Sequence, residues 1–151
     1  MAVGVNALAA IPARSRIYLD TNVWIYALEG FQSFAQPLAE LFARIDDGEL
    51  AAVTSELTLS EALVKPFQSN QHELELIYLD TLQTSETLTV APVSREVLTS
   101  AARLRAQYPS IKLPDAIHAA TALAQDARMF ITNDARFGTV GALTSIVLNA
   151  S

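Results

Sequence analysis

The sequence predicts an α/β fold: a three-layer α/β/α sandwich around a central parallel sheet of about five strands. Short apolar segments rich in β-branched and aromatic residues alternate with longer segments whose apolar residues recur every three or four positions. Strands that alternate with helices in this way favour a parallel sheet with right-handed crossovers and helices on both faces. A chain of 151 residues, 51% of them hydrophobic, is long enough to build one such core.

The first strand and helix follow each other directly. Residues 17–19 are Ile, Tyr and Leu, which favour a strand, and Asn22 is the predicted N-cap of a helix that continues to Leu28. The residues before them are small and weakly apolar and lack the basic start of a signal peptide. We therefore expect a flexible leader over residues 1–15 and a single domain over residues 16–151.

The rest of the chain continues the alternation. The later strands are predicted over residues 50–53, 88–93, 128–132 and 143–148. The helices are predicted along an apolar stripe from Phe34 to Ile45, over 56–64 after a cap at Thr54 or Ser55, over 72–82, after a cap at Ser94, and over 115–125. Pro66 is expected to end the second of these, and Pro114 to open the last.

Composition limits the possible functions. The chain has no cysteine, which excludes disulfides and thiolate chemistry and is compatible with a reducing compartment. No apolar run approaches the roughly 20 residues that span a bilayer. The formal net charge of −6 argues against a nucleic-acid partner, because phosphate is bound by Lys and Arg. That objection weakens if the acids gather around bound cations, which reverse the local sign of the charge.

Four acidic residues occupy unusual positions. Asp20 and Asp134 directly follow predicted strands, whose carboxyl ends share one edge of a parallel sheet. Glu61 interrupts the apolar stripe of its own helix, and Asp115 lies in the first turn of a helix with a face of small residues. Each has a structural alternative: Asp20 as a helix cap, Asp115 as a partner of the helix dipole, and Asp134 as a turn residue. Glu61 is harder to dismiss, because Glu is rarely buried without a partner.

The four acids are more informative together than singly. Two carboxylates about 4 Å apart repel by roughly 4 kcal/mol at an effective dielectric constant near 20. Such a cluster is stable only with divalent cations or with raised pKa values. Ligands that are all oxygen, in a chain without Cys, favour Mg²⁺ or Mn²⁺ over zinc. Metals in sites of this kind activate water and stabilise in-line displacement at phosphate.

The chain resembles the PIN domain family, and most closely the VapC-type toxin ribonucleases of toxin–antitoxin pairs. Four segments between residues 17 and 137 carry the resemblance, each with its acid: IYLDTNVWIYAL, TSELTLSEAL, LPDAIHAATAL and FITNDARF. The resemblance implies a five-stranded parallel sheet flanked by helices, a small antitoxin as partner and a homodimer. It also implies a metal-binding quartet with two supporting polar residues: Asp20, Glu61, Asp115 and Asp134, supported by Asn22 and Thr132.

The expected function is that of a cytoplasmic, metal-dependent endoribonuclease that uses Mg²⁺ or Mn²⁺. Metal-activated water would hydrolyse RNA and leave a 5′-phosphate and a 3′-hydroxyl, and Arg136 is a candidate contact for phosphate. One alternative is a non-catalytic PIN-like module that binds a partner. The other is a haloacid-dehalogenase-like phosphatase, which would need a second Asp where the chain has Asn22.

Overall fold

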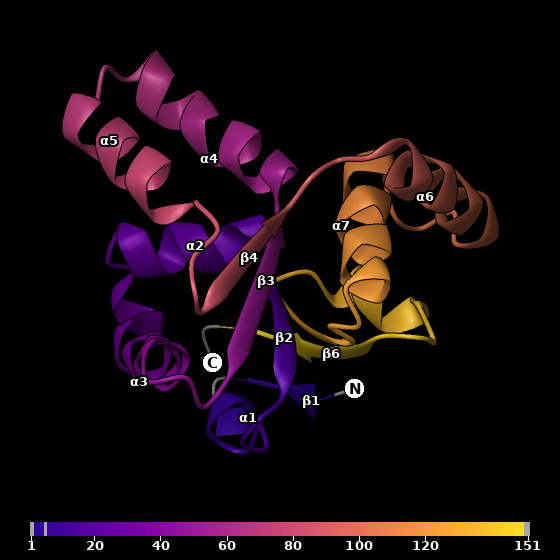
Figure 1. Cartoon of the computed structure of the whole chain (residues 1–151), viewed down its shortest axis with the longest axis horizontal. Helices are drawn as coiled ribbons and strands as arrows, with labels where there is room; N and C mark the ends of the chain where they lie inside the picture. Colours follow the sequence, from indigo (N-terminus) through magenta and orange to yellow (C-terminus); the bar gives the residue numbers. More distant parts are fainter. Residues whose placement is uncertain (1, 5, 150–151) are drawn as a thin grey trace.

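The computed structural model describes residues 2–4 and 6–149. In these residues, the central sheet is parallel throughout and has the strand order β1-β6-β5-β2-β3-β4 (Figure 1). Its strands are β1 (Ala2–Val3), β2 (Arg16–Leu19), β3 (Ala51–Ser55), β4 (Leu88–Ala91), β5 (Met129–Thr132) and β6 (Thr144–Val147). The α-helices are α1 (Asn6–Ala9), α2 (Thr21–Leu28), α3 (Ala35–Asp46), α4 (Glu56–Gln68), α5 (His72–Thr81), α6 (Arg95–Gln107) and α7 (Leu113–Ala124). The predicted fold class is confirmed.

The two faces of the sheet are covered by different helices. Along β2, Ile17 and Leu19 belong to the core cluster that includes side chains of α1 to α5, whereas Tyr18 belongs to the cluster of α6 and α7. This division follows from the period of two in a strand, where successive side chains point to opposite faces. Helices α2 to α5 therefore lie on one side of the sheet and α6 and α7 on the other (Figure 1).

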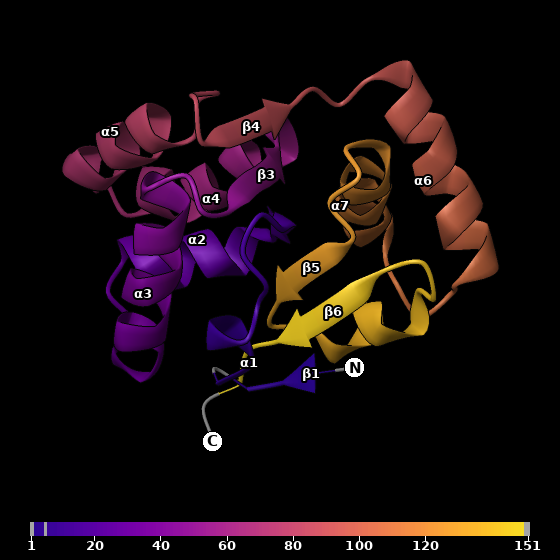
Figure 2. The same ribbon diagram turned by 60° about the horizontal axis from the view of Figure 1, so that its bottom comes forward.

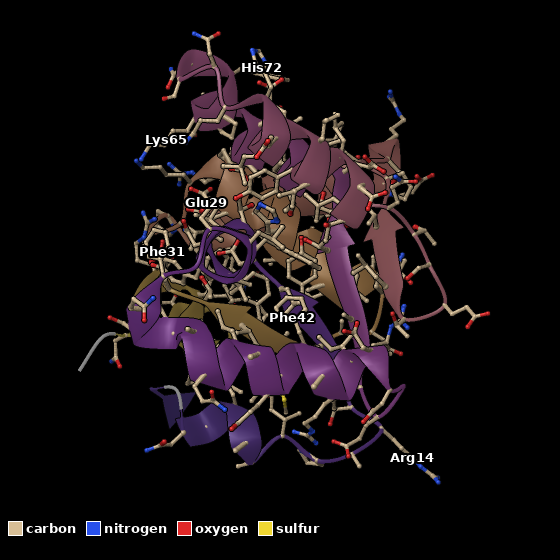
Figure 3. The ribbon with its side chains drawn as sticks, turned by 90° about the vertical axis from the view of Figure 1, so that its left-hand side faces the viewer. Arg14, Glu29, Phe31, Phe42, Lys65 and His72 are labelled. Carbon is tan, nitrogen blue, oxygen red and sulfur yellow. The ribbon has the colours of Figure 1, made fainter. Side chains whose placement is uncertain are left out.

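Aromatic side chains fill the α2–α5 layer. Trp24 of α2 and Phe42 of α3 meet edge to face, with their ring centroids 5.2 Å apart. Figure 3 shows this side of the molecule, with Phe42 on the inward side of α3. The indole nitrogen of Trp24 donates to the carbonyl oxygen of Leu19, so the buried donor is satisfied. These contacts fix α2, and with it the residues at its N-terminus, against the end of β2.

Small residues bring α7 close to the sheet and to α6. Ala116, Ala119 and Ala120 are buried on α7, which packs against α6 and β3. Beneath them, Tyr18 stacks on Phe130 with ring centroids 4.9 Å apart. The close approach of α7 brings His118 within hydrogen-bond distance of Tyr18, at the core end of the candidate site.

Part of the N-terminal segment, predicted to be a flexible leader, contacts the sheet and the core in the structure. Residues 2–3 form β1, which pairs in parallel with β6 and extends the sheet by one strand (Figure 2). Leu8 and Ile11 are buried in the core cluster of the α2–α5 layer. A guanidinium nitrogen of Arg44 donates to the carbonyl oxygen of Ile11 at 2.7 Å. Burial of two large apolar side chains favours this ordered arrangement over a free tail.

Two predicted helix boundaries are wrong. Helix α4 does not end before Pro66 but continues to Gln68. Because Pro66 lies in the last turn, its missing N–H removes only one helical hydrogen bond. The Pro66 ring is buried, and its packing offsets the loss of that bond. Helix α2 starts at Thr21 with Asp20 as its N-cap, so Asn22 lies inside the first turn rather than at the cap.

Among the described residues, no helix has the length and apolar character needed to cross a membrane.

Candidate active site

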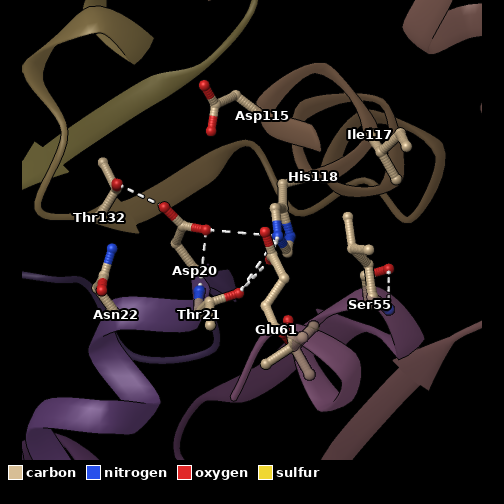
Figure 4. A network of polar contacts seen from close by, with 12 residues as sticks. Asp20, Thr21, Asn22, Ser55, Glu61, Asp115, Ile117, His118 and Thr132 are labelled. Atoms are coloured by element: carbon tan, nitrogen blue, oxygen red, sulfur yellow. Dashed lines mark hydrogen bonds and ion pairs between the residues drawn. The ribbon is translucent and has the colours of Figure 1, made fainter. Parts of the chain in front are cut away.

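The four predicted acids come from four different elements and lie at the carboxyl-terminal edge of the sheet. Asp20 follows β2 and Asp134 follows β5, while Glu61 and Asp115 project from α4 and α7. Figure 4 shows Asp20, Glu61 and Asp115 turned toward the same space. The structure joins these acids in two pairs, and each pair shares one nitrogen-bearing side chain. Asp20 and Glu61 share His118, whereas Asp115 and Asp134 share Arg136.

Asp20 is both a helix cap and the most buried acid of the site. One carboxylate oxygen accepts from the backbone N–H of Thr21 at 2.9 Å, and the other accepts from the Thr132 hydroxyl at 2.7 Å. Asp20 as a whole is only 6% exposed. Burial raises the pKa of Asp20 above its ordinary value, and this outweighs the opposite effects of His118 and of the hydrogen bonds. An acid that is costly to ionise in isolation gains from a nearby cation.

His118 is the central residue of the first pair. Its Nε2 atom lies 2.6 Å from Oε1 of Glu61 and 3.7 Å from Oδ1 of Asp20 (Figure 4). Its Nδ1 atom lies 2.6 Å from the Tyr18 hydroxyl oxygen. Burial alone would lower the pKa of His118, but the hydrogen bond to Glu61 and the charges of the surrounding acids raise it overall. The raised pKa favours the protonated imidazole beside Asp20 and Glu61.

The pKa of Glu61 is shifted in the opposite direction from that of His118. Burial alone would raise its pKa, but the hydrogen bond and charge of His118, together with the Thr21 hydroxyl, lower it overall. The Thr21 hydroxyl donates to Oε1 of Glu61 at 2.7 Å, the same oxygen that faces His118. Glu61 is therefore held in its ionised form by two donors.

Arg136 is the central residue of the second pair. Its Nε atom lies 2.9 Å from each carboxylate oxygen of Asp134, and its terminal NH2 nitrogen contacts both Oδ2 of Asp134 and Oδ2 of Asp115, the latter at 3.3 Å. The backbone N–H of Lys112 also donates to Oδ2 of Asp115, at 3.1 Å. The hydrogen bond from Arg136 lowers the pKa of Asp134 below its ordinary value.

The two predicted supporting residues lie beside these acids. The Thr132 hydroxyl donates to Asp20 and accepts from the backbone N–H of Asp134 at 3.1 Å, so it connects the two pairs. The side-chain amide of Asn22 donates to Asn133 at 3.0 Å, and Asn133 in turn donates to the Tyr26 hydroxyl at 2.8 Å. Asn22 thus joins α2 to the loop after β5 rather than contacting an acid directly.

Sequence reasoning did not foresee that Thr21 donates to Glu61, that His118 lies between Glu61 and Asp20, or that Tyr18 contacts His118. For His118, the sequence favours a residue that supports the acids or packs in the core over an acid–base group. Its position three residues after Asp115 places it on the same side of α7, which is the one signal that the sequence offered. Tyr18 lies 100 residues away in the chain, and nothing local indicates its hydrogen bond to His118.

The donor chemistry of the site fits a hard divalent cation. Four carboxylates at one edge of a sheet, one of them nine-tenths buried, are the oxygen ligands that Mg²⁺ and Mn²⁺ prefer. Over residues 2–4 and 6–149, however, no three Asp, Glu or His side chains lie close enough together to coordinate one ion. A bound ion would therefore compete with Arg136 and His118 for the carboxylate oxygens.

The structure is a parallel α/β sandwich with acids from separated segments at the carboxyl ends of its strands. The family model of the PIN domain matches residues 17–143, and the chain belongs to the PIN domain family. A search of curated proteins found no match.

Solved structures with the same fold come from toxin–antitoxin systems. VapBC2 from Rickettsia felis, bound to a DNA fragment from its promoter, is 20% identical with a TM-score of 0.67, covering 86% of this chain and 96% of that one. VapC20 from Mycobacterium tuberculosis, a toxin that cleaves the sarcin–ricin loop, is 16% identical with a TM-score of 0.68, covering 83% and 95%. A toxin–antitoxin complex from Klebsiella pneumoniae is 24% identical with a TM-score of 0.62, covering 85% and 95%.

Proposed function

We propose that the chain is a metal-dependent endoribonuclease, the toxin of a type II toxin–antitoxin pair. The observation that carries this proposal is the presence of four acids at one edge of a PIN-domain sheet, two of them just after β2 and β5 and two on α4 and α7. The buried position of Asp20, which raises its pKa, also supports a cation beside its carboxylate. The proposed assignment also explains how a chain with a net charge of −6 binds RNA, since ions at the site reverse the local charge.

Asp20, Asp115 and Asp134 would hold Mg²⁺ or Mn²⁺, and Glu61 would hold an ion or orient the attacking water. The bound ion would lower the pKa of that water and stabilise the charge that develops on the phosphate. Hydrolysis would add the water oxygen to phosphorus and break the bond to the 3′ oxygen, which takes up a proton. The products are a 5′-phosphate and a 3′-hydroxyl. Thr132 would keep Asp20 in place, and Asn22 would fix the loop that carries Asp134.

Restraint of such an activity requires a partner. The likeness to toxin–antitoxin complexes supports a small antitoxin protein as that partner. The proposed assembly is a homodimer of this chain with bound antitoxin, and the proposed location is the cytoplasm.

The main competing function is a non-catalytic PIN module. One observation favours it: each acid is already balanced by an internal nitrogen, as a purely structural site would be. The phosphatase alternative is not retained, because the chain belongs to the PIN domain family and carries Asn22 where the phosphatase family needs its second Asp.

Cleavage of single-stranded RNA in the presence and absence of Mn²⁺ tests the proposal. We expect the wild-type chain to cut RNA with Mn²⁺ and to be inactive with EDTA, and Asp20→Asn to be inactive in both conditions. Asp126→Asn is the matched control, because Asp126 is highly exposed and outside the site, and this variant should cut like the wild type. Wild-type protein that folds and binds Mn²⁺ but leaves RNA intact would favour the non-catalytic alternative.

A further inference from the structure

The guanidinium group of Arg136 bridges two carboxylates that belong to different elements. Its terminal NH2 nitrogen contacts Oδ2 of Asp134, after β5, and Oδ2 of Asp115, on α7. Its Nε atom contacts both oxygens of Asp134. A third group, the carbonyl oxygen of Ser110, accepts from NH1 at 3.4 Å. The guanidinium therefore uses the carboxylate oxygens that a metal ion would need.

The charges of this pair explain why a cation lies there. Asp115 and Asp134 face each other across Arg136, and without a cation their like charges would repel. A guanidinium is always protonated and forms two-point hydrogen bonds with carboxylates, so it satisfies both acids. A divalent ion would do the same with a higher charge. The two cations therefore compete for one set of oxygens.

Release of the guanidinium would not require unfolding. The side chain of Arg136 is 42% exposed, and exposed ion pairs are weak. The backbone N–H of Arg136 donates separately to Oδ1 of Asp134 at 2.9 Å. Through this bond, Asp134 caps the short 3-10 helix Ala135–Thr139. The main chain at Arg136 thus stays fixed to the site while the end of its side chain is free to turn outward.

We propose that Arg136 is a built-in competitor of the divalent ion, which occupies the Asp115–Asp134 pair in the metal-free protein and turns to the RNA phosphate when the ion binds. The first half of this proposal concerns metal binding alone, whereas the second half rests on the proposed ribonuclease function. A positive side chain released beside an acidic centre suits a phosphate group, because it adds positive charge where a negatively charged substrate must approach.

Titration calorimetry with Mn²⁺ alone tests the first half. We expect Arg136→Gln to bind Mn²⁺ roughly fivefold more tightly than the wild type at low salt, since the competing cation is gone. The difference should shrink as salt rises, because exposed ion pairs are screened. Arg128→Gln is the matched control: Arg128 also pairs with an Asp two residues before it, Asp126, but outside the site. Equal or weaker Mn²⁺ binding by Arg136→Gln, with an unchanged melting curve, would overturn the proposal.

A second measurement uses the wild-type protein and does not depend on the folding of a variant. The ¹⁵N–¹H signal of the Arg136 Nε group should shift during a titration with diamagnetic Mg²⁺, whereas that of Arg128 should not. An Arg136 signal that stays constant at saturating Mg²⁺ would show that the ion leaves the guanidinium in place, and the inference would fail.

Kinetics on single-stranded RNA at saturating Mn²⁺ test the second half. Arg136→Gln should raise KM more than it lowers kcat, and Arg136→Lys should recover part of the lost affinity for RNA, since Lys keeps the charge. An unchanged KM would overturn the phosphate role while leaving the competition with metal intact. If the wild type cuts no RNA but Arg136→Gln binds Mn²⁺ more tightly than the wild type, the ribonuclease proposal fails and the competition with metal stands.

Discussion

The Nε2 atom of His118 lies 2.6 Å from Oε1 of Glu61, and this contact connects α7 to α4 across the candidate site. The two residues are 57 positions apart and differ in exposure, since the His118 side chain is 2% exposed and that of Glu61 is 36% exposed. The ring is also fixed from behind by the Tyr18 hydroxyl. Glu61 is therefore oriented by a buried group rather than by solvent.

Removal of this imidazole should destabilise the fold. His118→Ala leaves the buried Tyr18 hydroxyl without its hydrogen-bond partner and removes the imidazole beside Asp20, and an unsatisfied buried polar group costs about 1–3 kcal/mol. Urea denaturation measures the loss. His72→Ala is the matched control, because His72 also faces a Glu, at 3.2 Å, but its side chain is 78% exposed. Its effect should stay within about 0.5 kcal/mol. Equal losses in the two variants would contradict a special role for His118.

The contribution of the His118–Glu61 pair to stability should depend on pH. The raised pKa of His118 stabilises the fold fully below the ordinary value of 6.5, and this contribution is lost as pH rises through the folded pKa. The lowered pKa of Glu61 stabilises the fold above the ordinary value of 4.5, and this contribution is lost as pH falls through the folded pKa.

The pair therefore contributes most between pH 4.5 and 6.5. Urea denaturation of the metal-free wild type and of His118→Ala at several pH values should show the largest difference in this window and a smaller one at pH 9. A difference that grows toward alkaline pH would have the wrong sign for an ion pair.

The sequence was sufficient to predict the fold class because the pattern is local. Alternation of strands such as residues 17–19 with amphipathic helices determines a parallel sheet, and the position of Asp20 and Asp134 after strands places them at one edge. The boundaries that failed depend on details beyond pattern. Asn22 and Asp20 are equally good N-caps by type, and the structure chooses the one nearer to the strand.

Contacts between distant segments determine the features that the local sequence pattern does not predict. The burial of Leu8 depends on the apolar surface that α3 offers, which no property of the first 15 residues reveals. The contact of Arg136 with Asp134 is nearly local, but its contact with Asp115 requires α7 to lie beside the end of β5. Pairing of the acids with internal cations is therefore a tertiary property, which the local sequence pattern does not predict.

Replacement of Asp20 by Asn should not weaken the fold in metal-free buffer. Burial raises the pKa of Asp20, so ionisation above the ordinary value of 3.8 favours the unfolded state, in which the carboxyl group is hydrated. Asn keeps the capping oxygen without the charge. Urea denaturation at pH 8 with EDTA should show Asp20→Asn to be equal to the wild type or up to about 1 kcal/mol more stable. The gain should vanish near pH 3, where the wild-type carboxyl is protonated as well. A large loss of stability at pH 8 would mean that the negative charge of Asp20 is needed for folding.

Truncation of Leu8 distinguishes a packed N-terminal segment from a flexible one. Leu8 lies on α1, is 3% exposed and belongs to the core cluster of the α2–α5 layer. Leu8→Ala should therefore lower the free energy of unfolding by about 2–4 kcal/mol, the usual cost of a cavity at a buried leucine. Leu98→Ala on α6 is the matched control, since Leu98 is 48% exposed and its truncation should cost well under about 1 kcal/mol. Urea denaturation of both variants measures the difference, and a Leu8→Ala protein as stable as Leu98→Ala would show that residues 6–11 do not belong to the folded core in solution.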